Sequence, residues 1–160
     1  MPTFDAVSEV NQHELDNAVQ QTVQEISRRF DLKDTSASAK YDQSEITLTA
    51  DDAFQIEQIE KILQTRLVAR KIDIKVLDGQ NVETNVSSAA KKFKIREGIS
   101  TEDGKQINKI IKASKIKAQS SIMDGKVRVT AKKIDDLRTI MDMIKEHNFN
   151  TPIQFNNFRD

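Results

Sequence analysis

Two stretches in the second half of the chain alternate cationic or polar residues with apolar ones, a pattern suited to holding phosphate. In Lys115–Gln119 and Lys126–Thr130, every second side chain is charged or polar. Successive side chains of a strand point to opposite faces, so the cations would share the face away from the core. The predicted phosphate-binding residues on this face are Lys115, Lys117, Lys126 and Arg128, extended by Lys92, Lys94 and Arg96 from a third alternating stretch.

A solvated surface is the alternative, because Lys and Arg on exposed strands also deter edge-to-edge pairing of sheets. Aromatic residues add little support for recognition of bases. The chain has no Trp and one Tyr, and the alternation places Phe93 on the core side of its strand. Single-stranded RNA is usually held by stacking on exposed aromatic side chains. The pattern therefore favours contacts to phosphates and leaves RNA binding open only in that form.

The formal net charge of zero conceals two halves of opposite sign. Residues 1–89 carry 9 Lys and Arg against 16 Asp and Glu, a net charge of −7. Residues 90–160 carry 16 against 9, a net charge of +7. A basic half on a neutral protein indicates that one region is built for an anion. The acidic half suggests a second hypothesis, in which it docks a protein partner.

The residues that commonly carry catalysis are sparse. The chain has no Cys and no GxxxxGK[ST] motif, and its His13 and His147 lie near expected helix ends. The acidic pairs Asp51–Asp52 and Asp135–Asp136 stand at expected helix starts, where carboxylates act as caps. We therefore expect a binding protein rather than an enzyme, with no metal and no cofactor. No apolar run approaches the length of a membrane span and no leader pattern is present, so we expect a cytoplasmic location.

An internal repeat organises the elements that would carry these residues. Ile46–Ala50 matches Val127–Ala131 at an offset of 81 residues, and the offset continues into the following helical pattern. Chance similarity of two amphipathic segments is the alternative. Each copy predicts a β-α-β-β-α-β order, which is an α+β, ferredoxin-like arrangement of an antiparallel sheet under two helices. The predicted domains are 1–89 and 90–160.

The expected elements follow from periodicity, caps and turns. In the first domain they are strand 4–10, a helix capped by Asn11, a hairpin of 36–41 and 45–50 around Asp42-Gln43-Ser44, a helix capped by Asp51 or Asp52, and strands 72–77 and 81–86. In the second they are strand 93–96, a helix capped by Ser100 or Thr101, a hairpin of 115–121 and 126–131 across Asp124-Gly125, a helix through Ile144, and strand 152–158.

Several stretches resemble the YajQ family of bacterial nucleotide-binding proteins, and the likeness covers essentially the whole chain. They are the opening MPTFDAVSEV, Arg29–Lys33, Gly104–Lys112, Lys115–Gln119, Gly125–Val129, Lys132–Leu137 and the closing Gln154–Asp160. The resemblance implies tandem ferredoxin-like domains related to RNA-binding folds, with the N-terminal strands exchanged between them. Under that exchange, Phe4–Val10 completes the second sheet and Phe93–Arg96 the first. Lys92, Lys94 and Arg96 would then leave the basic sheet.

The resemblance also implies a function, namely binding of a nucleotide or nucleic acid, with cyclic di-GMP signalling in some members. It adds Lys33, Lys132, Lys133 and Arg159 as candidate phosphate-binding residues, because they lie in family-like motifs. Asp34 stands where the family usually has Gly, and Ile134 where it usually has Arg. Both departures are expected to weaken an anion site.

The sequence therefore predicts a non-catalytic protein that binds a phosphate-bearing ligand such as GTP, ATP or cyclic di-GMP through a basic sheet face. The alternatives are an RNA-binding module and an adaptor that docks a protein or transcription factor.

Overall fold

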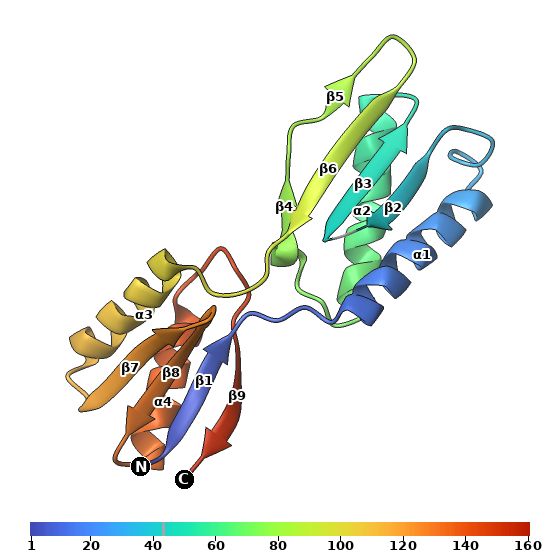
Figure 1. Ribbon diagram of the computed structural model, residues 1–160. Coiled ribbons are helices and arrows are strands. Elements are labelled where there is room, and N and C mark those ends of the chain that lie inside the picture. Colours follow the sequence, from blue (N-terminus) through green and yellow to red (C-terminus); the bar gives the residue numbers. More distant parts are fainter. Residues whose placement is uncertain (43) are drawn as a thin grey trace. The chain divides into compact units, whose positions relative to one another are not determined.

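The computed structural model describes residues 1–42 and 44–160, so the predicted turn at Gln43 lies outside the described residues. The chain forms two compact units. Unit 1 consists of Met1–Glu9 and Glu97–Asp160, and unit 2 of Val10–Arg96. Each unit has an antiparallel sheet with two helices on one face (Figure 1). The predicted α+β, ferredoxin-like fold class is confirmed.

Unit 2 builds its sheet in the order β2-β3-β6-β4, with β5 paired to β6. Asn11 and Asp52 cap its helices as predicted, because their side chains accept the N–H groups of Glu14 at 3.2 Å and Gln55 at 2.9 Å. The apolar faces of both helices, with residues such as Leu15 and Ile59, pack on the sheet. The elements are α1 (Gln12–Arg28), β2 (Ser38–Asp42), β3 (Glu45–Ala50), α2 (Ala53–Ala69), the 3-10 turn η1 (Ile74–Val76), β4 (Leu77–Gly79), β5 (Glu83–Thr84) and β6 (Ala89–Ile95).

Unit 1 has the strand order β7-β8-β1-β9, and Phe4, Val129 and Ile140 lie in its core. Asp124 and Gly125 form the predicted hairpin turn with φ values of 48° and 74°. Such a pair of positive φ values matches the twist of the flanking strands. The elements are β1 (Thr3–Val7), α3 (Thr101–Ser114), β7 (Ala118–Met123), β8 (Lys126–Ala131), α4 (Ile134–Glu146) and β9 (Gln154–Arg159).

The strand that precedes the first helix of each repeat pairs in the sheet of the other repeat. β1 lies between β8 and β9, although the chain continues from it into unit 2. β6 pairs with β3 and β4, although the chain continues from it into α3 of unit 1. A division at residue 89 would have placed β1 with α1 and β6 with α3. The strand pairing has the exchanged arrangement instead.

This exchange removes the charge contrast between the two halves of the sequence. Unit 1 carries 12 Lys and Arg against 11 Asp and Glu, a net charge of +1. Unit 2 carries 13 against 14, a net charge of −1. Asp5 of β1 and the cations of β6 belong to the sheet of the other half of the sequence. Any anion site must therefore arise from local arrangement, because neither folded unit has a strongly basic balance.

Two predicted strands differ from the structure. The segment 72–77, expected as one strand, contains the 3-10 turn η1, capped by the side chain of Asp73, and only its last residue begins β4. Lys115, expected in a strand, is the C-cap of α3 in the left-handed conformation with a φ of 60°. β7 begins only at Ala118, because the helix continues to Ser114 and the left-handed residue ends it.

Candidate functional site

The sheet face of unit 1 that lies opposite its helices, here called the open face, presents polar side chains in register. In the middle row, Asp5 lies opposite Arg128 on one side and Asn156 on the other. In the end row, Thr3 lies between Thr130 and Arg159, and Gln119 follows beyond Thr130. Apolar partners such as Phe4 and Val129 alternate with these residues and face the core.

An ion pair between a buried carboxylate and a partly exposed guanidinium occupies the middle of the open face. Asp5 is only 4% exposed. Arg128 donates from Nε to Asp5 Oδ1 at 2.9 Å, and Asn157 donates from Nδ2 to Oδ2 at 2.9 Å. The hydrogen bond from Arg128 is the main reason that the pKa of the Asp5 carboxyl lies below its usual value of 3.8. Arg128, predicted as a phosphate ligand, thus already holds a carboxylate of its own chain.

A bulge in β9 supplies the second donor of this cluster. Asn157 has a φ of 55°, and the pairing of β1 with β9 shifts its register between Thr3 and Asp5. The extra residue lets Phe155 and Phe158 both face the helices, with ring centroids 5.4 Å and 6.4 Å from that of Phe4. The bulge therefore turns an asparagine toward Asp5 and a second phenylalanine toward α4.

Several other predicted cations also have carboxylate partners or lie in unit 2. Lys126 lies 3.8 Å from Glu9. Lys92, Lys94 and Arg96 were placed on the basic sheet by alternation, and this assignment is wrong, because β6 pairs with β3. Lys92 is 3.8 Å from Glu45 there, and Arg96 is 3.2 Å from Asp78. Lys33 also belongs to unit 2, where its Nζ lies 5.4 Å from the centre of the Phe30 ring.

The remaining predicted cations gather at one end of the unit 1 sheet. Lys117 and Lys132 line a small hollow of about 230 Å³ together with Gln119 and Thr130. Lys132 also lines a second, open hollow of about 560 Å³, with other residues that include Lys133, Asp135 and Asp160. Across residues 1–42 and 44–160, we find no ion pair for Lys115, Lys117, Lys132 or Lys133.

The start of α4 lies at the same end. Lys133 is its N-cap residue and makes no side-chain capping bond. Asp135 and Asp136, predicted as caps, lie in the first turn instead. Asp135 is 4.0 Å from Arg138 in an exposed pair. The helix dipole places partial positive charge at this start, beside the two neighbouring lysines.

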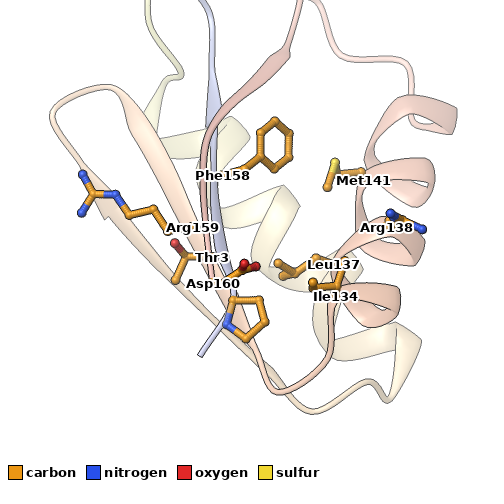
Figure 2. Close-up of a pocket in the computed structure, with 9 residues that line it drawn as sticks. Thr3, Ile134, Leu137, Arg138, Met141, Phe158, Arg159 and Asp160 are labelled. Carbon is orange, nitrogen blue, oxygen red and sulfur yellow. The ribbon is translucent and has the colours of Figure 1, made fainter.

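A third hollow was not found from the sequence. It has a volume of about 470 Å³ and lies against α4 and the last residues of β9 (Figure 2). Ile134, Leu137, Met141 and Phe158 give it an apolar wall, and polar residues at its rim include Arg138 and Asp160. Figure 2 shows Arg159, another lining residue, extending away to the opposite side of its strand, toward the open face. The helical spacing of Ile134, Leu137 and Met141 was the only sequence signal for this wall.

Comparison with known proteins places the chain among relatives of the same length. The family model described as "Nucleotide-binding protein YajQ-like" matches residues 2–159. The chain belongs to this family. Proteins named as nucleotide-binding proteins are 42% identical in Magnetococcus marinus, 43% in Bordetella avium and 41% in Xanthomonas oryzae pv. oryzae. Each alignment covers 100% of both chains.

The described residues provide neither a membrane-spanning helix nor a metal-binding cluster. No helix found there is both long and apolar enough to cross a membrane. Within the same part of the chain, no three His, Cys, Asp or Glu side chains gather in a way that could hold a metal ion.

Proposed function

We propose that this YajQ-like protein binds a phosphate-bearing nucleotide, such as GTP, ATP or cyclic di-GMP, at the end of the unit 1 sheet, without catalysis. One observation carries the proposal. Lys117 and Lys132 line one hollow at this end, Lys132 and Lys133 line another, and none of the three has an ion pair among the described residues, whereas Lys126 and Arg128 on the same sheet are paired. The names of the relatives support the same ligand class. A cytoplasmic location, where such nucleotides occur, is part of the proposal.

The side chains between these cations suit a nucleotide. Thr3, Thr130 and Gln119 form a row of hydroxyl and amide groups across three strands. These groups both donate and accept hydrogen bonds, as phosphate oxygens and ribose hydroxyls require. Arg159 on β9 lies at the other end of this row, opposite Thr3. Its planar guanidinium can hold a phosphate through two hydrogen bonds, whereas each lysine acts as a point charge.

The structure gives less support to the two alternatives. The open-face residues of β1 and β8, the two central strands, are Thr3, Asp5, Val7, Lys126, Arg128 and Thr130, and none of these is aromatic. RNA would therefore have to bind mainly through its phosphates. The adaptor hypothesis assumed an acidic domain, but the folded units have net charges of only +1 and −1.

The test is calorimetric titration of nucleotide-free protein with GTP, ATP, cyclic di-GMP and a short single-stranded RNA. We expect saturable binding of a mononucleotide or cyclic dinucleotide. The double variant Lys117→Glu/Lys132→Glu should weaken it by about tenfold or more, because charge-assisted hydrogen bonds are lost. Lys126→Glu is the matched control on the same face, since that lysine already faces Glu9.

Repeating the titrations at two salt concentrations separates the ligand classes. Binding of single-stranded RNA through several phosphates loses affinity steeply, with a slope of about −0.7 per contact in a double-logarithmic plot. A nucleotide should show a shallower slope. Binding of RNA alone would move the function to the nucleic-acid alternative. Absence of binding to all four ligands would contradict the proposal.

A further inference from the structure

We infer that the apolar cavity beside Phe158 holds the base of the bound nucleotide, while Lys132 and Lys133 hold its phosphates. This inference rests on the proposed function and assigns a place to each part of the ligand. The cavity, the lysines and the residues between them all belong to unit 1.

The cavity has the size and the lining of a small-molecule site. Its volume of about 470 Å³ lies within the range of roughly 300–1,000 Å³ typical of such pockets. Phe158 is 60% exposed and Ile134 is 47% exposed, although both line a concave surface. Figure 2 shows Phe158 and Met141 facing each other across the space. A planar heteroaromatic ring would cover this apolar surface and stack against the phenylalanine.

The orientation of Phe158 depends on the bulge at Asn157. In a regular strand, Phe155 and Phe158 would point to opposite faces. The extra residue puts both on the helix side, where Phe155 packs at the core and Phe158 remains partly exposed beside α4. The same bulge thus serves the buried Asp5 cluster on one face and the cavity wall on the other.

Shared residues connect the apolar cavity to the unpaired lysines. Pro2, Ile134 and Asp160 line both the cavity and the open hollow of Lys132 and Lys133. Lys132 in turn lines the small hollow that contains Lys117. An apolar recess therefore continues into a polar hollow at the end of the sheet, where Lys132 and Lys133 lie with Asp135 and Asp160. A nucleotide has the same division, with an apolar ring at one end and phosphates at the other.

The polar residues at the rim fit the edge of a base. Asp160 lines the cavity, and its carboxylate can accept hydrogen bonds from ring amino or imino groups. Arg138 lies on the neighbouring turn of α4 and is partly engaged by Asp135 at 4.0 Å.

The first experiment uses the absence of Trp from the chain. Phe158→Trp places a single fluorophore in the cavity wall, and Phe54→Trp, at a side chain that is 66% exposed on α2, is the control in unit 2. GTP, ATP and cyclic di-GMP are titrated into each variant, and pyrophosphate serves as a ligand without a base. We expect saturable quenching in Phe158→Trp by a nucleotide, none by pyrophosphate, and no change in Phe54→Trp.

The second experiment measures affinity by calorimetry. Phe158→Ala should weaken nucleotide binding by about tenfold and leave pyrophosphate binding unchanged, because only stacking on the base is lost. Phe54→Ala should change neither. Lys117→Glu/Lys132→Glu should weaken the binding of both the nucleotide and pyrophosphate. Circular dichroism of Phe158→Ala verifies its fold, and Phe158→Trp gives an independent readout if that variant unfolds.

The outcomes separate the two claims. If no nucleotide binds to the unaltered protein, both the proposed function and this inference are overturned. If nucleotides bind and depend on the lysines, but a folded Phe158→Ala retains full affinity, the inference alone fails. It also fails if a bound nucleotide leaves the fluorescence of Phe158→Trp unchanged, or if pyrophosphate quenches it equally.

Discussion

Units 1 and 2 share one strand order but differ at the centre of their open faces. In unit 1, Asp5 on β1 lies opposite Arg128 on β8. At the corresponding place in unit 2, Lys92 on β6 lies opposite Thr47 on β3. Thr47 and Arg128 are separated by the 81 residues of the internal repeat. The same fold thus carries an ion pair with a buried carboxylate in one unit and an exposed lysine beside Glu45 in the other.

The contrast shows how a nearly neutral unit can still offer a cationic site. The ion pair holds Arg128 in the middle of the sheet of unit 1, while Lys117 and Lys132 at its end have no ion pair within residues 1–42 and 44–160. In unit 2, acidic neighbours such as Glu45 and Asp78 lie beside Lys92 and Arg96. The position of carboxylates, rather than the number of cations, distinguishes the two open faces.

The largest expected effect comes from Asp5→Ala, which should destabilise unit 1 by about 2 kcal/mol. The substitution removes a buried carboxylate that accepts charge-assisted hydrogen bonds, and partial exposure of Arg128 limits the cost of leaving it unpaired. Lys92→Ala, the matched change in unit 2, should stay within about 0.5 kcal/mol. Urea unfolding followed by tryptophan at position 158 or 54 reports each unit. Equal effects in the two units would contradict the comparison.

Low pH should remove part of the same stability of unit 1 that Asp5→Ala removes. Because the pKa of Asp5 is lowered by Arg128, its contribution to the free energy of unfolding is complete above the usual value of 3.8 and disappears as pH falls through the lower folded value. Unit 1 should therefore lose this stability as the pH falls below about 4. Thermal melts across pH 2–7 measure it, and the difference between the protein and Asp5→Asn should shrink toward low pH. A constant difference would refute the assignment.

A smaller effect is expected at the hairpin of unit 1. Gly125→Ala should cost about 1 kcal/mol, because Gly125 has a φ of 74° that an L-residue with a Cβ adopts only with strain. The nearest atoms to an added Cβ lie at ordinary contact distances of 3.5 Å and 3.8 Å, so the cost arises from the backbone. Gly125→Asn should be milder, since Asn tolerates this conformation. Urea midpoints with tryptophan at position 158 would measure both.

The smallest effect is expected at Asp34 in unit 2, where the stability should rise. Asp34 has a φ of 63°, in the left-handed region that Gly adopts without strain. Asp34→Gly should stabilise unit 2 by about 0.5 kcal/mol, because relief of backbone strain exceeds the extra entropy of the unfolded chain. Melting followed by tryptophan at position 54 should move upward, and unit 1 should not change. A lower melting temperature would mean that the carboxylate has a role of its own.

Local chemistry made much of the fold predictable. Helix caps such as Asn11 and Ser100, and the turn at Asp124–Gly125, follow from short patterns that contain their own physical cause. The alternation of residues correctly predicted which side chains of β8 face the core. The pattern contains no information about which distant strand pairs with β8. The partnership of β1 with β8 depends on contacts between residues such as Asp5 and Arg128, which are 123 positions apart.

The candidate site was only partly predictable for the same reason. Lys117 and Lys132 were identified from alternation and family-like motifs, but their lack of a carboxylate partner depends on the fold. Asp5 was missed, although one carboxylate inside the apolar run Phe4–Val7 was a usable signal, because a buried acid needs a donor. Phe158 was missed because the bulge at Asn157 changes the alternation that the sequence suggests.

The exchange of strands also affects how the protein is made. Residues 10–96 form unit 2 without a break, so they can complete their sheet while the ribosome is still translating the remainder. β1 is synthesised before unit 2, whereas both of its neighbours, β8 and β9, begin after residue 125. At about 5–20 residues per second, Phe4 and Ala6 remain uncovered for several seconds before β8 is made. The nascent chain therefore presents this apolar strand to chaperones until β8 and β9 have been synthesised.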